Sequence, residues 1–230
     1  MDTVILAAGR GSRLEGLAPP YFKPLLIVDG EPLIRRLIRT AKDVAGGRIV
    51  VVAAPENALP LCQVLGDIPA EIVIQRRPRG PGDALLTGLR LVTSPDVYVL
   101  LGDNVVSRQD AKNVAQAASP AVGVVPLPPA EAERFTYLAP ENVWVEKLPR
   151  PQTAEEADLP CWVGPLKLRT QDIQAAIEDW IRRTPAGAEP GREVPIGPLL
   201  NQQGPATLVR VSSVDVGVPA AWNMAATAKE

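Results

Sequence analysis

Short runs of apolar, β-branched residues alternate along the chain with segments whose apolar side chains recur at helical spacing. Thr3–Ala7 and Arg48–Ala53 are short and almost uniformly apolar, which predicts strands buried on both faces of a sheet. Between them, Pro32–Asp43 places its apolar side chains three and four residues apart, as in an amphipathic helix. A strand–helix–strand order predicts βαβ units, and therefore a mainly parallel sheet with helices on both faces.

This alternation continues to about residue 126, after which the pattern becomes more antiparallel. The elements expected in the first half are strands at Thr3–Ala7, Arg48–Ala53, Glu71–Gln75, Asp96–Leu101 and Val122–Pro126 and helices at Pro32–Asp43, Glu56–Leu65, Gly82–Leu91 and Arg108–Ala118. Those expected in the second half are a hairpin of Phe135–Leu138 and Val143–Lys147, strands at Cys161–Leu168 and Ala206–Val211, and helices at Thr170–Arg183, Pro195–Gln203 and Pro219–Ala228. We find no internal repeat and no long linker, so we expect one domain over residues 1–230.

Composition excludes several classes of function. The chain has no histidine, which rules out Ser-His-Asp, Cys-His and HExxH chemistry, and its two distant cysteines cannot form a Cys₄ zinc site. A net charge of −2 argues against a nucleic-acid partner. The apolar runs are too short for a membrane helix, and the first residues do not resemble a signal peptide, so we expect no membrane association and a cytoplasmic location.

A glycine-containing loop follows the first predicted strand directly. Its sequence is Ala8-Gly9-Arg10-Gly11-Ser12-Arg13-Leu14, and its small residues allow backbone N–H groups to approach a phosphate closely. No Gly-Lys-Ser/Thr follows, so it is not a Walker A loop. Leu14 occupies the place of the third glycine of a dinucleotide fingerprint, which argues against a Rossmann oxidoreductase.

This loop, taken with Lys23-Pro24-Leu25-Leu26, resembles the sugar-1-phosphate nucleotidyltransferase (NDP-sugar pyrophosphorylase) family, in particular the glucose-1-phosphate thymidylyl- and uridylyltransferases. The resemblance implies a Rossmann-like fold whose mainly parallel mixed sheet is flanked by helices and carries a small antiparallel sugar-binding insertion. Residues 1–126 would form the nucleotide-binding half and residues 127–230 the acceptor-binding half. The residues expected to wrap the nucleotide are Leu6, Ala7, Ala8, Gly9, Arg10, Gly11, Ser12 and Arg13.

Further stretches extend the resemblance over most of the chain. Gln75 and Gly80 match the family segment that reads the base, often uracil or thymine, and a glutamine amide offers the donor and acceptor that an imide edge requires. Asp103 follows a buried strand, at the end of the sheet where α/β folds bind ligands. The resemblance implies that Asp103 contacts the nucleotide and that Asp103 and Asp215 hold Mg²⁺ as the cofactor.

The predicted acceptor site is assigned by the same resemblance. It implies that Asn104, Glu146, Lys147 and Gly164 contact the sugar phosphate. Here the family's Glu-Lys-Pro motif is interrupted, because Leu148 separates Lys147 from the next proline.

The implied reaction is the attack of a sugar 1-phosphate on the α-phosphorus of a nucleoside triphosphate, UTP or dTTP being favoured, with release of pyrophosphate. Arg13, Lys23 and Lys147 are the expected catalytic residues: the first two neutralise the leaving pyrophosphate and the third positions the attacking phosphate. Two alternatives stay open: a cytidylyltransferase that acts on phosphocholine or another non-sugar phosphate, and a non-catalytic nucleotide-binding protein of this fold. Family members often form homo-oligomers, and the sequence leaves the oligomeric state open.

Overall fold

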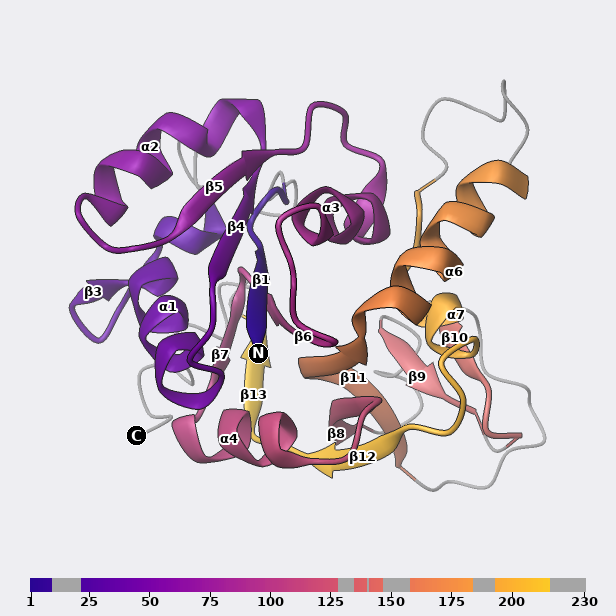
Figure 1. Cartoon of the computed structure of the whole chain (residues 1–230). Coiled ribbons are helices and arrows are strands. Elements are labelled where there is room, and N and C mark those ends of the chain that lie inside the picture. The colour runs from indigo at the N-terminus through magenta and orange to yellow at the C-terminus, as the bar shows by residue number, and fades with distance from the viewer. Residues whose placement is uncertain (10–21, 128–134, 140, 147–157, 184–192, 216–230) are drawn as a thin grey trace, which may run out of the picture.

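The chain folds around one nine-stranded mixed sheet with helices on both faces (Figure 1). The computed structural model describes residues 1–9, 22–127, 135–139, 141–146, 158–183 and 193–215. The strands of the main sheet are β1 (Asp2–Leu6), β4 (Ile49–Ala53), β5 (Glu71–Ile74), β6 (Asp96–Leu101), β8 (Ala121–Leu127), β9 (Thr136–Leu138), β10 (Trp144–Glu146), β11 (Leu159–Arg169) and β12 (Thr207–Arg210). Two small antiparallel pairs are β2 (Ile27–Val28) with β3 (Glu31–Pro32) and β7 (Asn104–Val106) with β13 (Ser213–Asp215).

The helices cover the sheet between these strands. They are α1 (Leu33–Val44), α2 (Pro55–Leu65), α3 (Gly80–Leu89), α4 (Arg108–Gln116), α6 (Thr170–Arg183), α7 (Gly197–Leu200) and the 3₁₀ helix η2 (Lys23–Leu25). Strands β6, β1, β4 and β5 lie side by side and are parallel. The long strand β11 then pairs antiparallel with β6, β8 and β9, and β12 pairs parallel with β8. The predicted α/β fold with a small antiparallel portion is therefore confirmed, and strands from both halves of the chain share one sheet.

Alternate side chains of each central strand enter two different cores. Ile5, Val51 and Tyr98 face the layer of α1, α2 and α4, whereas Val4 and Val99 face α3, α6 and α7. All five residues of β4 are buried, which is why that strand has no polar face. On the second face α3 lies very close to β1. The closeness is seen at Gly88, where an added Cβ would come within 2.6 Å of the Val4 side chain. The continuous apolar runs of the sequence thus arise from coverage on both faces.

Most predicted elements form with small shifts, and the two largest differences involve proline and glycine. The expected helix at Pro195–Gln203 reduces to the four residues of α7, where Gly197 packs so tightly on Thr136 that a Cβ at position 197 would clash with it. Strand β11 is longer than expected and includes Pro160 and Pro165. A register shift between Trp162 and Leu166 accommodates the second proline. The predicted helix Pro219–Ala228 lies outside the described residues.

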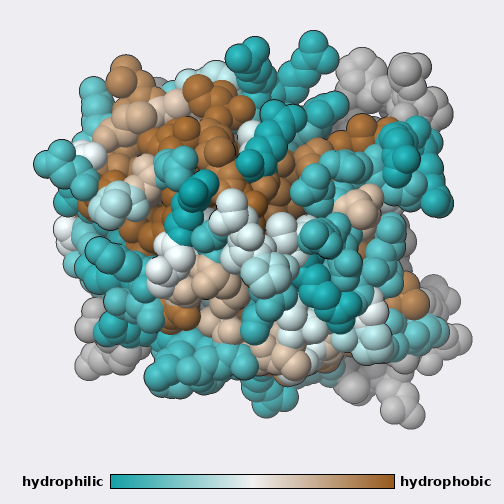
Figure 2. Space-filling view, in the orientation of Figure 1, coloured by the Kyte–Doolittle hydropathy of each residue, from teal (hydrophilic) through white to brown (hydrophobic). Residues whose placement is uncertain are grey.

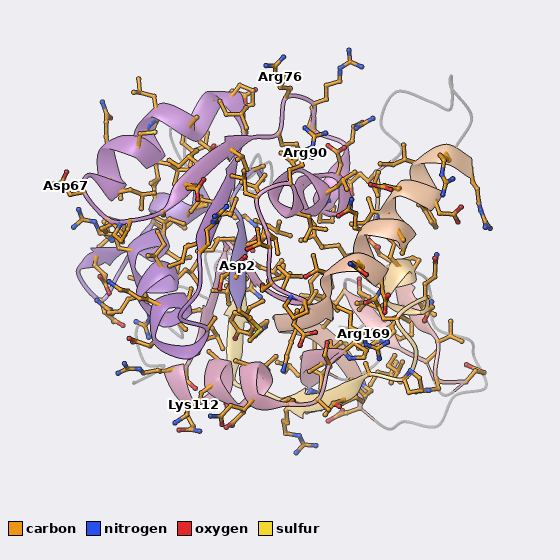
Figure 3. The ribbon with its side chains drawn as sticks, viewed as in Figure 1. Asp2, Asp67, Arg76, Arg90, Lys112 and Arg169 are labelled. Atoms are coloured by element: carbon orange, nitrogen blue, oxygen red, sulfur yellow. The ribbon has the colours of Figure 1, made fainter. Side chains whose placement is uncertain are left out.

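Asp2 joins the amino ends of three neighbouring strands. Its Oδ1 accepts the backbone N–H of Arg48 at 3.0 Å, and its Oδ2 accepts those of Thr93 at 2.8 Å and Ser94 at 3.2 Å. Only 7% of Asp2 is exposed, and Figure 3 labels it near the centre of the view, at the start of β1. Burial by itself raises the pKa of this carboxyl, but the hydrogen bonds from Thr93, Arg48 and Ser94 outweigh it, so the net pKa is lowered.

We expect Asp2→Asn to lower the free energy of unfolding at pH 7 by about 1–3 kcal/mol, because the amide loses the charge and turns an NH₂ group toward backbone donors. The folded-state pKa of Asp2 is lowered, so its stabilisation is complete above the unfolded pKa of ~3.9 and is lost as the pH falls through the folded value. Urea denaturation at pH 7 and near pH 3 measures this, and the gap between variant and wild type should shrink in acid. Asp67→Asn, at an exposed site, is the matched control (Figure 3); an equal gap at both pH values would contradict the prediction.

The surface in Figure 2 has an apolar area over α2 and the edge strand β5, where Leu59 is 67% and Ile74 is 46% exposed.

None of the helices that the structure describes is both long and apolar enough to cross a membrane. Both cysteines are free thiols, Cys62 exposed and Cys161 buried, and burial raises the pKa of Cys161 to about 12.

Candidate active site

Lys23 and Asp103 form an ion pair at the carboxyl ends of the two central strands. The Lys23 Nζ lies 2.7 Å from the Asp103 Oδ2, although 80 residues separate them in the chain. The lysine side chain is 12% exposed and the aspartate side chain 31%, so solvent and a ligand can reach the carboxylate while most of the lysine is packed. The edge formed by the ends of parallel strands is where α/β sheets bind ligands.

Gly102 brings these two residues together. Its N–H donates to the carbonyl of Leu6 at 2.9 Å, which joins the end of β6 to the end of β1. A Cβ on Gly102 would lie 2.7 Å from the Leu6 oxygen and 3.2 Å from Pro24. The buried Pro24 therefore packs beside this crossing, and the adjacent Lys23 reaches Asp103. A side chain at position 102 would force the strand ends apart.

Asn57, which is not among the residues predicted from the sequence, supports the start of the glycine-containing loop. This residue of α2 is fully buried; its Nδ2 donates to the carbonyl of Ala7 at 2.8 Å, and its Oδ1 accepts the N–H of Ala54 at 2.8 Å. It thereby fixes the chain where β1 ends and the loop begins at Ala8 and Gly9. The only sequence signal was an asparagine in the first turn of a helix that begins with Pro55.

Gln75 and Gly80, both predicted to read the base, lie in contact. Gln75 follows β5, and its N–H donates to the Ala53 carbonyl at 2.9 Å. Gln75 is only 6% exposed. Its Nε2 donates to the Gly80 carbonyl at 3.1 Å and to the Asp83 Oδ2 at 2.8 Å. The other oxygen of Asp83 accepts from Arg79. Neither Asp83 nor Arg79 was among the predicted site residues.

The second predicted metal ligand lies on a strand that pairs next to the first. Strands β7 and β13 are antiparallel, and their register places Asp215 opposite Asn104, the residue after Asp103. The Asp215 side chain lies outside the description. Asn104 is buried and its Nδ2 donates to the carbonyl of Val163, so it connects this corner of the site to β11. Within the described ranges, no cluster of three or more carboxylate or cysteine side chains is suited to hold a metal.

The remaining predicted acceptor residues lie farther along the sheet. Glu146 ends β10, which β9 and β11 separate from β6. Gly164 lies in β11 at the irregularity in its pairing with β8, and a Cβ there would come within 3.1 Å of Gly123 and 2.8 Å of Val211. Close packing of strands thus accounts for a glycine at 164 without any ligand. Of the other predicted site residues, Arg10, Gly11, Ser12, Arg13 and Lys147 lie outside the described residues.

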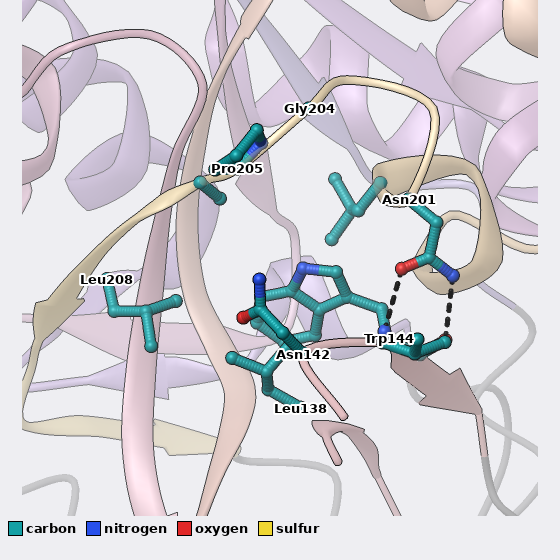
Figure 4. Close-up of a pocket in the computed structure, with 10 residues that line it drawn as sticks. Leu138, Asn142, Trp144, Asn201, Gly204, Pro205 and Leu208 are labelled. Carbon is teal, nitrogen blue, oxygen red and sulfur yellow. Dashed lines mark hydrogen bonds between the residues drawn. The ribbon is translucent and has the colours of Figure 1, made fainter. Parts of the chain in front are cut away.

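A cavity of about 320 Å³ lies between the β9–β10 hairpin and the segment that joins α7 to β12 (Figure 4). Asn201 forms one end of it, accepting the Trp144 N–H at 2.7 Å through Oδ1 and donating to the Trp144 carbonyl at 3.1 Å through Nδ2. Its lining includes Leu138, Asn142 and Leu208 but none of the predicted site residues. Asn201 caps the backbone of the edge strand β10, so its amide serves the fold.

Comparison with known proteins gives a consistent result. The family model described as "MobA-like NTP transferase domain" matches residues 3–180. A 101-residue stretch is 31% identical to the bifunctional protein GlmU of Buchnera aphidicola, covering 44% of this chain and 21% of that protein. A glucose-1-phosphate thymidylyltransferase of Actinoplanes sp. is 29% identical over 128 residues, covering 54% of this chain and 42% of that protein. The chain thus spans less than half the length of these relatives.

The fold matches solved structures over nearly its whole length. A UDP-glucose pyrophosphorylase solved with UDP-glucose superposes with a TM-score of 0.73 at 20% identity, and the superposition covers 99% of this chain and 97% of the other. At this identity the likeness concerns the fold.

Proposed function

Since the chain belongs to the family of MobA-like NTP transferase domains, we propose that it transfers a nucleotidyl group from a nucleoside triphosphate to a sugar 1-phosphate. The observation that carries this proposal is the pairing of Lys23 with Asp103 at the carboxyl ends of β6 and β1, beside the start of the glycine-containing loop. The named relatives, a thymidylyltransferase and a structure that holds UDP-glucose, support UTP or dTTP as the donor.

The residues present suit phosphoryl chemistry without a histidine. One oxygen of the sugar phosphate attacks the α-phosphorus, a new P–O bond forms, and the bond to the β-phosphate oxygen breaks as pyrophosphate leaves. A phosphate monoester loses its second proton near pH ~6, so the attacking oxygen is largely ionised at neutral pH and needs no general base. The requirement is alignment and neutralisation of charge, and we propose Lys23, Arg13 and Lys147 for this role; the position of Lys23 beside Asp103 supports its part.

Asp103 is a suitable ligand for a hard divalent cation, because its carboxylate is partly exposed and already binds an ammonium group. The opposition of Asp215 to Asn104 in the β7–β13 pair brings the backbone of a second aspartate beside it. We propose that Asp103 and Asp215 hold Mg²⁺. When bound, the ion supplies positive charge to the phosphates. Lys23 would then turn its ammonium from the carboxylate to a phosphate oxygen, without leaving its packed position.

Pyrophosphate release from UTP, dTTP, CTP, ATP and GTP, each with glucose 1-phosphate, other sugar 1-phosphates or phosphocholine and Mg²⁺, tests the proposal. We expect release chiefly when UTP or dTTP is present together with a sugar 1-phosphate. Activity restricted to CTP with phosphocholine would replace the proposal by the cytidylyltransferase alternative. Nucleotide binding without turnover across the whole panel would show a non-catalytic protein of this fold.

A further inference from the structure

The hydrogen bonds around Gln75 fix which end of its amide can meet a ligand. Its amide group has two neighbours that only accept, the Gly80 carbonyl and the Asp83 carboxylate, at 3.1 and 2.8 Å. The atom that faces them must therefore be Nε2, whose two hydrogens are both used. Among the described residues, none donates to Oε1, so the carbonyl oxygen is the group left for a ligand.

Asp83 itself is held in place. It is 6% exposed and lies in the first turn of α3, and Arg79, one turn earlier, donates to its second oxygen. The arginine side chain is half exposed, so this pair adds little stability by itself. Its effect is geometric, because it directs one carboxylate oxygen to solvent-facing Arg79 and the other to buried Gln75.

We propose that Asp83 is a positioning residue that locks the Gln75 amide with its oxygen toward the nucleotide, and that this lock selects uracil or thymine over cytosine. The inference rests on the proposed function. Uracil and thymine carry a hydrogen at N3, which a fixed acceptor can bind, whereas cytosine has a lone pair there. A freely rotating glutamine could serve either base by exchanging Oε1 for Nε2. The carboxylate of Asp83 removes that freedom.

Asp83→Asn changes the hydrogen bonding to the Gln75 amide but keeps the packing of α3, because the two side chains have nearly the same shape. Asparagine has one oxygen where aspartate has two, and Arg79 competes for it. Its Nδ2 is then turned toward Gln75, where two NH₂ groups cannot pair, and the Gln75 amide loses its fixed orientation. Removing the competitor as well, in Arg79→Met with Asp83→Asn, frees the asparagine oxygen for Gln75. The double variant should therefore recover what the single variant lost.

Equilibrium binding of UTP and CTP with Mg²⁺ and without an acceptor measures the selection. We expect the wild type to bind UTP at least about tenfold more tightly than CTP, because one mismatched hydrogen bond costs about that much in affinity. The preference should fall close to unity in Asp83→Asn, persist in Arg79→Met and return in the double variant. Asp172→Asn, which removes a similar but exposed pair between Arg169 at the end of β11 and Asp172 of α6, is the matched control and should keep the preference. A wild type that binds both nucleotides equally, or a double variant no better than Asp83→Asn, overturns the proposal.

A second measurement does not depend on nucleotide binding. The side-chain NH₂ signals of Gln75 in NMR spectra, assigned by their loss in Gln75→Leu, should exchange slowly with water in the wild type and in Asp172→Asn, and faster in Asp83→Asn. Equal exchange in wild type and Asp83→Asn overturns the positioning role whether or not the protein binds a nucleotide. If the wild type shows slow exchange but binds no nucleotide, the positioning of Gln75 by Asp83 stands, whereas the proposed function and the base selection are both overturned.

Discussion

Asp103→Asn is expected to reduce nucleotidyl transfer by about a thousandfold or more, the largest effect that we predict for a single substitution. The amide keeps the size of the side chain but removes its negative charge, which is what we propose to hold Mg²⁺ and what pairs with Lys23 at 2.7 Å. A metal ion contributes several kcal/mol of charge stabilisation, and a thousandfold corresponds to about 4 kcal/mol. Initial rates of pyrophosphate release at saturating substrate and Mg²⁺ measure the loss.

The matched control lies on the same strand. Asp96 begins β6 at its amino end, opposite the edge where Asp103 follows its carboxyl end, so Asp96→Asn should keep nearly full activity. Urea denaturation of Asp103→Asn shows whether the protein is still folded. Normal turnover by a folded Asp103→Asn protein would contradict the metal assignment.

Lys23→Met is expected to lower kcat by about a hundredfold and to raise the KM for the nucleotide. Methionine preserves much of the packing of a side chain that is only 12% exposed, but it removes the charge proposed to neutralise the phosphates. Loss of one preorganised charge that acts on the transition state costs about 10²–10³ in rate. Lys23→Arg should recover part of the activity, because it restores the charge with a different shape.

Lys112, an exposed lysine of α4, provides the control for removing a lysine charge (Figure 3). Lys112→Met should have the kcat and KM of the wild type. An unchanged kcat in Lys23→Met would show that Lys23 only supports the fold around Asp103. In that case the pairing seen at the strand ends would have no part in the chemistry.

Much of the fold could be predicted because its signals are local. The apolar runs of β1, β4 and β6 and the helical spacing of α1 are properties of short segments, and each formed within a few residues of its expected position. Prediction from the sequence failed where contacts with distant residues determine the extent of a helix or strand. Gly197, the first residue of the short α7, packs closely on Thr136 of β9, and β11 continues through Pro165, where its register against β8 shifts.

The residues of the candidate site also fall into two groups, those that a local motif indicates and those whose contacts depend on the fold. Lys23, Gln75 and Asp103 could be predicted as site residues because each lies in a short motif. Lys23 belongs to the family motif Lys23-Pro24-Leu25-Leu26, and Gln75 and Asp103 lie at or just after the ends of predicted strands. Asn57, Arg79 and Asp83 were missed because an asparagine or aspartate in the first turn of a helix ordinarily only caps that helix. What these residues contact, Ala7 for Asn57 and Gln75 for Asp83, depends on neighbouring strands and turns that no local pattern specifies.

Strand burial and strand ends are encoded in consecutive residues, so the class of fold, a mainly parallel sheet covered on both faces, and the presence of charged residues after the strands follow from local sequence. It takes the folded chain to bring Lys23 to Asp103, to pair β13 beside it, and to turn the nitrogen of the Gln75 amide toward Asp83. The physical reason is that strand order and the orientation of an amide are set by hydrogen-bond partners from other parts of the chain.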